Sequence, residues 1–371
     1  MFSWNKMVSA ITLVSCCVSQ PGVATETATG SFTYVCQEAG AGGYQAFPDV
    51  CRLQDGRLMC VFYAGYHHIS LPCPQFPKGG RISYCTSRDE GHSWSKAKVL
   101  YDSPEDDRDS SIIQLKNGQI ICNFFMIHRT ADARQPCPDP YEEPRTTLGT
   151  WIVASDDLGK TWTTPRQVYG DYTASSPIRE LSDGRLILPL YGRAERGVYR
   201  AATGHCAVGI SDDGGKIWSK PIVINNGGRP PLSENDVIEL ADRTLYAVER
   251  GAVTNSAMCY SVSKDRGKIW SISKPIGFQG HSPYLHRTRD GIIILAYRLH
   301  SAASTCLRYS LDECKTWSDN IVVDKVMGAY PSMVNLKDGS VLIVYYEEIS
   351  GSAIRAKRFR VAKTGIQWFA P

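Results

Sequence analysis

The 371-residue chain lacks the features that mark several large classes of protein. Its formal charge is only +4 and no dense basic run is present, so nothing indicates nucleic-acid binding. No two cysteines have Cys-x-x-Cys spacing, so the sequence predicts no zinc site, and we expect neither another metal nor a cofactor. No linker or low-complexity segment interrupts the chain. These absences favour one continuous domain.

The chain also lacks an apolar run long enough to act as a stable membrane anchor. Met7–Val18 is apolar and follows Lys6, which is typical of a signal peptide, and we place this peptide at residues 1–28. Leu13–Cys16 resembles a bacterial lipobox, whose cysteine is lipidated after cleavage; otherwise Cys16 is a small apolar residue of the signal. In both cases we expect residues 29–371 to be exported as one domain that is secreted, periplasmic or lipid-anchored at the cell envelope.

The thirteen cysteines are odd in number and define no disulfide framework. Five lie in strand-like runs, where a free cysteine behaves as a small buried apolar residue: Cys60, Cys85, Cys122, Cys259 and Cys306. Cys73 and Cys137 lie in proline-flanked loops and are the best candidates for a disulfide bond.

One eight-residue pattern occurs five times. It reads SDDLGKTW at Ser155–Trp162, and the other copies begin at Ser87, Ser211, Ser263 and Ser310. Each copy fits a tight turn, in which the Asp accepts hydrogen bonds from turn amides, the Gly supplies a positive φ and the Trp folds back as an apolar plug. Repeats spaced by tens of residues indicate a stacked or radial architecture.

A second repeat alternates with the first. An apolar strand, a two-residue polar turn and another apolar strand recur from Val50, Ile112, Ile178, Val237, Leu285 and Val334. Five of the six turns are Asp-Gly or Asn-Gly, the strongest short signal for a hairpin. Six hairpins, five of them followed by the eight-residue pattern, predict an all-β six-bladed propeller of four-stranded antiparallel blades. Ile354–Val361 is the only strand expected after Glu348, so we expect Ser31–Gln37 to supply the missing strand and close the ring.

The strand order of such a blade determines which face can hold a site. Turns from the first to the second strand and from the third to the fourth share one face, so the hairpins and the eight-residue patterns lie together. The opposite face receives the long insertions Gly65–Gly80 and Arg129–Gly149, which are rich in Pro, His and Cys. Because functional loops gather on one face of a rigid scaffold, we expect the site on the insertion face.

Aligning the six hairpins places two sets of residues at the mouth of the central channel. The first set, at the starts of first strands, is Phe47, Asp109, Ser175, Glu234, Ser282 and Tyr330. The second set, at the ends of second strands, is Tyr63, Phe125, Tyr191, Arg250, Arg298 and Tyr346. Carboxylates, a phenol and arginines that converge in this way are typical of a site, although polar groups at a propeller mouth also simply pair with one another.

The eight-residue pattern is the Asp box, and the chain resembles the sialidase superfamily over nearly its whole length, with similarity to glycoside hydrolase family 33. Leu232–Leu240 resembles the strand that carries the glutamate partner of the nucleophile, which implies this role for Glu234. Gly328–Met333 is similar to the segment that holds the tyrosine nucleophile, which implies this role for Tyr330.

The resemblance also implies a set of arginines that binds a substrate carboxylate. Leu245–Arg250 resembles the strand that ends in the family's second arginine. Arg298 is a candidate for the third, whose usual position falls closer to Ala303. Val344–Glu347 resembles the strand whose glutamate, here Glu347, orients the first arginine.

Two parts of the family's site are missing from their usual positions. Ala46–Pro48 stands where the family has Arg-Ile-Pro, so the first arginine is absent. No acidic residue lies between Tyr66 and Tyr84, where the family's catalytic Asp is expected. That stretch offers only basic candidates: His67, His68, Lys78 and Arg81. His67 and Arg81 are candidate substrate contacts, and either histidine is also a candidate acid.

Asp106–Asp109 begins the second blade in the same register as Glu234 and Tyr330. Arg108 is therefore a candidate for the missing arginine, and Asp109 or Asp107 for the catalytic acid. The alternative is a surface charge run, or an internal ion pair that holds the start of the blade.

The resemblance implies an exo-acting, retaining glycoside hydrolase that releases a terminal sialic acid from glycans. Sialic acid carries a carboxylate on its anomeric carbon, which would repel a carboxylate nucleophile, whereas a neutral Tyr330 activated by Glu234 avoids that repulsion. Arginines suit the carboxylate because they form paired, charge-assisted hydrogen bonds. The expected partners are sialylated or other acidic glycans. A hydrolase for a different acidic sugar and a non-catalytic glycan-binding propeller remain alternatives.

Overall fold

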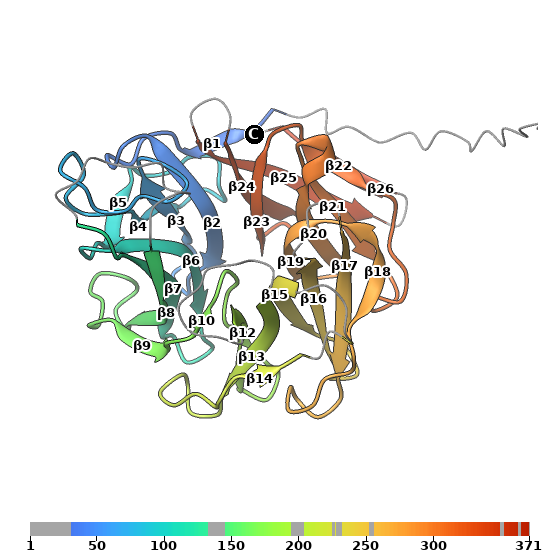
Figure 1. The fold of residues 1–371 in the computed structure, drawn as a ribbon. Coiled ribbons are helices and arrows are strands. Elements are labelled where there is room, and N and C mark those ends of the chain that lie inside the picture. The colour runs from blue at the N-terminus through green and yellow to red at the C-terminus, as the bar shows by residue number, and fades with distance from the viewer. Residues whose placement is uncertain are drawn as a thin grey trace, which may run out of the picture.

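The computed structural model describes residues 31–132, 145–193, 204–224, 227, 232–251, 256–348, 352–362 and 365–370. The predicted signal peptide, Cys16 and Cys137 lie outside these ranges. The described residues form six antiparallel sheets that are arranged as a ring (Figure 1). The all-β six-bladed propeller that the repeats predicted is therefore confirmed.

The first three blades follow one another along the chain. Blade 1 consists of β2 (Tyr44–Arg52), β3 (Leu58–Gly65), β4 (Arg81–Ser87) and β5 (Lys98–Tyr101). Blade 2 consists of β6 (Asp106–Gln114), β7 (Ile120–Arg129), β8 (Arg145–Ser155) and β9 (Arg166–Tyr169). Blade 3 consists of β10 (Tyr172–Thr173) and β11 (Arg179–Glu180), which both pair with β12 (Leu186–Arg193), then β13 (Gly204–Ser211) and β14 (Ile222–Val223).

The last three blades complete the ring. Blade 4 consists of β15 (Leu232–Glu239), β16 (Leu245–Gly251), β17 (Ala257–Ser263) and β18 (Lys274–Gln279). Blade 5 consists of β19 (His281–Arg287), β20 (Ile293–Leu299), β21 (Ser304–Ser310) and β22 (Ile321–Asp324). Blade 6 consists of β23 (Gly328–Asn335), β24 (Val341–Glu347) and β25 (Ile354–Ala362), completed by β1 (Thr33–Cys36) and β26 (Gly365–Phe369).

The N-terminal strand closes the ring as predicted, because β1 pairs antiparallel with β25 and Tyr34 lies opposite Arg355. The expectation of a single strand after Glu348 was wrong, since β26 also pairs with β25, from Arg358 to Ala362. β1 is only four residues long and β25 has nine, so β1 leaves the second half of that edge uncovered. The C-terminal strand covers it, and this removes an exposed sheet edge.

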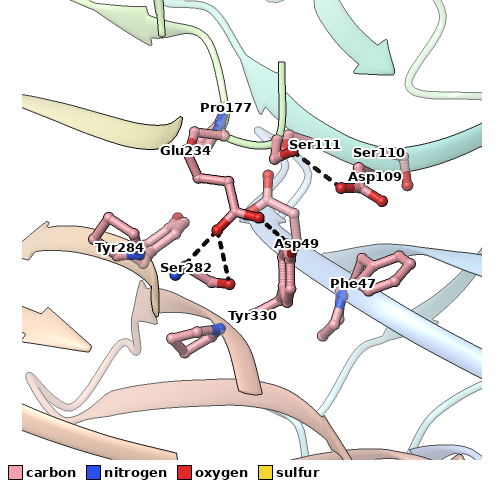
Figure 2. Close-up of a pocket in the computed structure, with 15 residues that line it drawn as sticks. Phe47, Asp49, Asp109, Ser110, Ser111, Pro177, Glu234, Ser282, Tyr284 and Tyr330 are labelled. Carbon is pink, nitrogen blue, oxygen red and sulfur yellow. Dashed lines mark hydrogen bonds between the residues drawn. The ribbon is translucent and has the colours of Figure 1, made fainter. Parts of the chain in front are cut away.

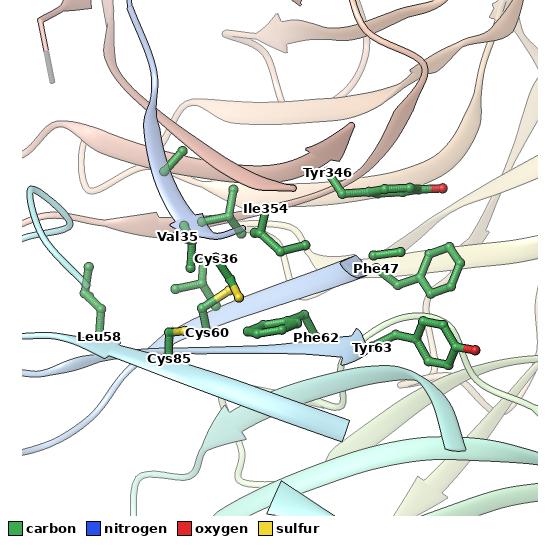
Figure 3. Packing of buried hydrophobic residues seen from close by; sticks show 14 of the residues in the cluster. Val35, Cys36, Phe47, Leu58, Cys60, Phe62, Tyr63, Cys85, Tyr346 and Ile354 are labelled. Atoms are coloured by element: carbon green, nitrogen blue, oxygen red, sulfur yellow. The ribbon is translucent and has the colours of Figure 1, made fainter. Parts of the chain in front are cut away.

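The seam between the last and first blades is an apolar core. Val35, Phe62 and Ile354 pack there with the rings of Tyr63 and Tyr346 (Figure 3). The five strand cysteines predicted to be free and buried are all free and buried. Cys73 is in a disulfide bond, as the proline-flanked loop suggested.

Each Asp box is a turn held by its own side chains. The Ser155 hydroxyl donates to Asp157 over 2.8 Å and accepts from the Gly159 amide over 2.9 Å. Asp157 also accepts from the Thr161 amide over 2.9 Å, and Gly159 has a φ of 79°. In the last copy Cys314 adopts the same left-handed conformation, at a φ of 63°. The predicted turn is confirmed.

The face that carries the hairpin turns and the Asp boxes is called the turn face below, and the opposite face the pocket face. Arg57, which follows the blade 1 hairpin turn, donates to the carbonyl of Leu158 in the blade 2 Asp box over 3.1 Å. Arg185 of the blade 3 hairpin likewise donates to Asp212 over 2.7 Å. Hairpins and Asp boxes therefore share one face, as predicted. No helix among the described residues has the length and apolarity needed to span a bilayer.

Candidate active site

A β-bulge occurs at the same point of the inner strand in five blades. The pairing shifts between Ala46 and Asp49 in β2, and at equivalent positions in β6, β15, β19 and β23. In four of these strands a residue in the bulge has a left-handed φ between 40° and 54°: Phe47, Asp109, Ser282 and Tyr330. A bulge redirects a side chain, and a non-glycine residue with positive φ marks a strained position.

These bulges bring the first predicted set together at the propeller axis. A single pocket is lined by all six of its members, Phe47, Asp109, Ser175, Glu234, Ser282 and Tyr330 (Figure 2). The second set lies beside the first, since Tyr63 pairs with Ala46 and Arg298 pairs with His281. The hairpin alignment thus placed residues from all six blades correctly.

Glu234 is the centre of the hydrogen-bond network in the pocket. Its Oε1 accepts from the Tyr330 hydroxyl over 2.5 Å and from Arg250 Nη1 over 2.7 Å. Its Oε2 accepts from the amide and the hydroxyl of Ser282, over 3.2 and 3.1 Å (Figure 2). Blades 4, 5 and 6 therefore meet at one carboxylate.

The electrostatics of this pair favour a carboxylate beside a neutral phenol. Burial acts to raise the pKa of Glu234, but the charge of Arg250 and the hydrogen bonds from Tyr330 and Arg250 hold it at about 2. Burial and the negative charges of Glu234 and Asp109 raise the pKa of Tyr330 well above its usual value. At neutral pH Glu234 is thus ionised and accepts a hydrogen bond from the neutral Tyr330.

A second arginine near Tyr330 comes from blade 5. Arg298 Nη2 donates to the Tyr346 hydroxyl over 3.0 Å, and its Nε donates to the carbonyl of Gly328. Its guanidinium also lies 5.3 Å from the centre of the Tyr330 ring. Arg250 and Arg298 therefore both lie close to Tyr330.

Blade 2 contributes Arg108 and Asp109, both buried. Asp109 accepts from the Ser175 hydroxyl over 3.0 Å and from Arg108 Nε over 3.3 Å. Burial raises the pKa of Asp109, against the opposing charge of Arg108. Arg108 also contacts Asp106 over 3.5 Å, and its guanidinium lies 5.2 Å from the centre of the Phe47 ring. Arg108 thus lies against Phe47, but two carboxylates already neutralise it.

The structure does not bring Glu347 into this network. Side chains alternate along a strand, so Glu347 and Tyr346 point in opposite directions. The Glu347 carboxylate accepts from Arg355, which also donates to Asp324 over 3.1 Å. The neighbouring carboxylate Glu348 lies on the side of Tyr346, and it accepts from the hydroxyls of Tyr346 and Tyr44 over 3.4 and 3.0 Å. The motif match missed Glu348, although counting two residues from Tyr346 would have found it.

Three other candidates take up different positions. Arg81 donates to the carbonyl oxygens of Ala39 and Gly40 between β1 and β2, over 2.6 and 2.9 Å. Asp107 accepts from the amide and the hydroxyl of Ser103, each over 2.7 Å. The His67 ring stacks parallel to that of Tyr44, at a centroid distance of 6.5 Å. Arg81 and Asp107 are therefore held outside the Glu234 network.

One histidine near Glu234 was not identified from sequence. His281 is buried next to Ser282, and its ring stacks on that of His300 at 5.7 Å. Burial and the charge of Arg250 lower the pKa of His281 to about 4, so it is neutral near pH 7. No group of three His, Cys, Asp or Glu side chains in the described ranges could hold a metal ion.

The family model for the BNR repeat-like domain matches residues 138–343, which is more than half of the chain. The chain therefore belongs to the BNR repeat-like family. No curated protein matches it. Within that family its fold is a sialidase-like BNR-repeat propeller, as solved structures indicate.

A protein of unknown function from Dyadobacter fermentans superposes with a TM-score of 0.75 at 21% identity, covering 89% of this chain and 98% of that one. A Hadza microbial sialidase superposes with a TM-score of 0.67 at 16% identity, covering 90% of this chain and 69% of that one. The leech intramolecular trans-sialidase superposes with a TM-score of 0.66 at 14% identity, covering 90% and 70%. At these identities the likeness shows the fold.

Proposed function

We propose that this protein is an exo-acting, retaining glycoside hydrolase that removes a terminal sialic acid or a related acidic sugar from glycans. The observation that carries the proposal is the 2.5 Å hydrogen bond from the Tyr330 hydroxyl to an ionised Glu234, with Arg250 and Arg298 beside it. A nucleophile in contact with its base and arginines for a carboxylate are what this reaction requires.

In the first step the Tyr330 oxygen forms a bond to the anomeric carbon and its proton passes to Glu234. The bond to the leaving-group oxygen breaks, and that oxygen takes a proton from an acid in the pocket. A substrate carboxylate bound by Arg250 competes with Glu234 for the guanidinium charge. Substrate binding therefore makes Glu234 a stronger base at the point where it is needed. In the second step water releases the sugar from Tyr330, and the anomeric configuration is retained.

Replacing Tyr330 with Phe tests the proposal, because it removes the nucleophilic oxygen and keeps the ring. With a fluorogenic sialoside we expect kcat to fall by a factor of at least about 10³, the usual scale for removing a nucleophile. Tyr260→Phe, a change to a tyrosine that stacks on Tyr246 away from the pocket, is the matched control and keeps wild-type turnover. Full activity in Tyr330→Phe, or no turnover of any glycoside by the wild type, would contradict the proposal.

One observation favours a different acidic sugar as the second candidate. Phe47 replaces an arginine, and its ring packs against those of Tyr330, Tyr44 and His68 at 4.7, 6.5 and 5.2 Å. The cation beside this aromatic cluster, Arg108, is already neutralised by Asp106 and Asp109, so fewer cations are available for a carboxylate than in the sialidase pattern. A panel of aryl sialosides, uronides and neutral glycosides separates the two candidates by which substrate has the highest kcat/KM.

A further inference from the structure

A histidine in the insertion between β3 and β4 is held by a carboxylate beside Phe47, which lines the pocket. His68 Nδ1 lies 3.1 Å from Glu348 Oε1 and 2.9 Å from the Tyr44 hydroxyl. Tyr44 in turn donates to the same Glu348 oxygen over 3.0 Å. Tyr44 donates its proton to Glu348, so the Tyr44 oxygen can only accept from His68. The contacts of His68 Nδ1 with Tyr44 and Glu348 are therefore hydrogen bonds when Nδ1 carries a proton.

The His68 ring lies one aromatic side chain away from the nucleophile. It packs edge-on against Phe47 at 5.2 Å, and Phe47 packs against Tyr330 at 4.7 Å. The imidazole thus approaches the pocket from blade 1, whereas Glu234 reaches Tyr330 from blade 4. A sugar bound on Tyr330 would have its base and this histidine on different sides.

We propose that His68, oriented by Glu348, is the proton donor to the leaving-group oxygen and the base for water in the second step. This inference rests on the proposed hydrolase function. It transfers to His68 the role that the sequence first suggested for Asp109. Glu348 acts through His68 and is a positioning residue.

The positions of the two candidates favour His68. A leaving group extends from the anomeric carbon toward solvent, so its proton donor has to lie near the opening of the pocket. The side chains of His68 and Glu348 are 25% and 27% exposed. That of Asp109 is 4% exposed, and its two oxygens accept from Arg108 and Ser175.

The proton and bond changes balance over the two steps. In the first step the bond between the anomeric carbon and the leaving oxygen breaks, and that oxygen takes a proton from the His68 imidazolium, while the Tyr330 proton moves to Glu234. In the second step the oxygen of water bonds to the anomeric carbon and its proton passes to neutral His68. Tyr330 leaves as its oxygen takes back the proton from Glu234.

The charged groups around His68 give this mechanism a pH window. Burial holds the pKa of His68 below its ordinary value of 6.5, although the hydrogen bond to Glu348 acts in the opposite direction. Arg108 also lowers this pKa and Asp109 raises it, while Tyr44 contributes a hydrogen bond and no charge at this pH. Donation requires the imidazolium, so kcat/KM falls as pH rises through the His68 pKa.

The decisive experiment compares glycosides with good and poor leaving groups. His68→Asn should lower kcat/KM for an alkyl glycoside by about 10² to 10⁴, because that leaving oxygen needs a proton. It should change kcat/KM for the 4-nitrophenyl glycoside less than about fivefold, since nitrophenolate leaves without one. The fall at high pH should disappear in His68→Asn. In Glu348→Gln it should move to lower pH, because the imidazolium loses its anionic partner.

His92→Asn on the turn face is the matched control and should leave both substrates and the pH profile unchanged. Melting temperatures confirm that each variant is folded. Equal loss on both substrates in His68→Asn overturns the inference, as does leaving-group selectivity in Asp109→Asn instead. Failure of the proposed function is a different result, because the wild type would then turn over neither substrate and the donor role would fall with it.

Discussion

The turn face and the pocket face of this propeller differ in how closely their side chains repeat from blade to blade. On the turn face the five Asp boxes make the same bond, from Ser to Asp, over 2.8 to 2.9 Å in every copy. On the pocket face the inner strands repeat a backbone bulge, but the aligned position holds five different residue types among six blades. The backbone geometry thus repeats around the ring, whereas the side chains at the aligned position of the pocket face differ between blades.

This difference predicts how the two regions respond to mutation. An Asp-box contact is a hydrogen bond within one turn, so losing a single copy costs only that local contact. A buried ion pair near the axis costs more to break, because the remaining charge is left buried without its partner. The three changes below test that contrast, from the largest expected effect to the smallest.

The largest effect is expected at the axis, where an ion pair joins blades 3 and 4. Arg179 Nε donates to Asp236 Oδ1 over 3.1 Å, and Asp236, which is fully buried, also accepts from the Leu285 amide of blade 5 over 2.7 Å. Arg179→Leu leaves a buried carboxylate without its cation, which should lower the free energy of unfolding by about 3 to 5 kcal/mol. Urea unfolding measures it.

The double variant Arg179→Leu/Asp236→Leu is the control for this loss. It removes both charges, so most of the stability should return. If Arg179→Leu alone lowered the free energy of unfolding by less than about 1 kcal/mol, the contrast between the axis and the turn face would be contradicted.

An intermediate effect is expected from removing one Asp-box hydroxyl. Ser155→Ala deletes the donor to Asp157 and the acceptor for the Gly159 amide. We expect the free energy of unfolding to fall by about 1 to 2 kcal/mol, the scale of two hydrogen bonds. The equivalent Ser87→Ala should give the same result, and glycosidase activity should not change in either. A tenfold loss of kcat in Ser155→Ala would show that the turn face does influence the pocket.

The smallest effect is expected where two Asp boxes have lost a hydrogen bond. Thr161 Oγ1 donates to Asp157 over 2.6 Å, whereas the boxes of blades 3 and 4 have Ile217 and Ile269 at this position, 74% and 73% exposed. Ile217→Thr restores the hydroxyl and should raise the melting temperature by up to about 1 °C. Thr161→Ile is the reverse change and should lower it by a similar amount. A lower melting temperature for Ile217→Thr, or a higher one for Thr161→Ile, in a calorimetric scan would contradict this account of the Asp box.

Much of the fold and part of the site followed from local signals in the sequence. The Asp-Gly turns and Asp boxes indicated six blades and the turn face, and their alignment placed Phe47, Asp109, Glu234 and Tyr330 around one pocket. This worked because a hairpin sets its own register, so equal spacing from six turns reaches equivalent positions. The same alignment missed β26, because that strand belongs to neither repeat and pairs with the part of β25 that β1 leaves uncovered.

The sequence by itself determined the number of blades, the strand that closes the ring and the residues that reach the axis, because turns and strand alternation are properties of a few neighbouring residues. Only the tertiary structure decided which partner each charged side chain has. It pairs Glu347 with Arg355, places Glu348 beside His68, and surrounds Arg108 with two carboxylates. Glu348 and His68 are 280 residues apart along the chain, so no local pattern could pair them. Neighbouring side chains on a strand point in opposite directions, so the fold also decides whether Glu347 or Glu348 lies on the side of Tyr346.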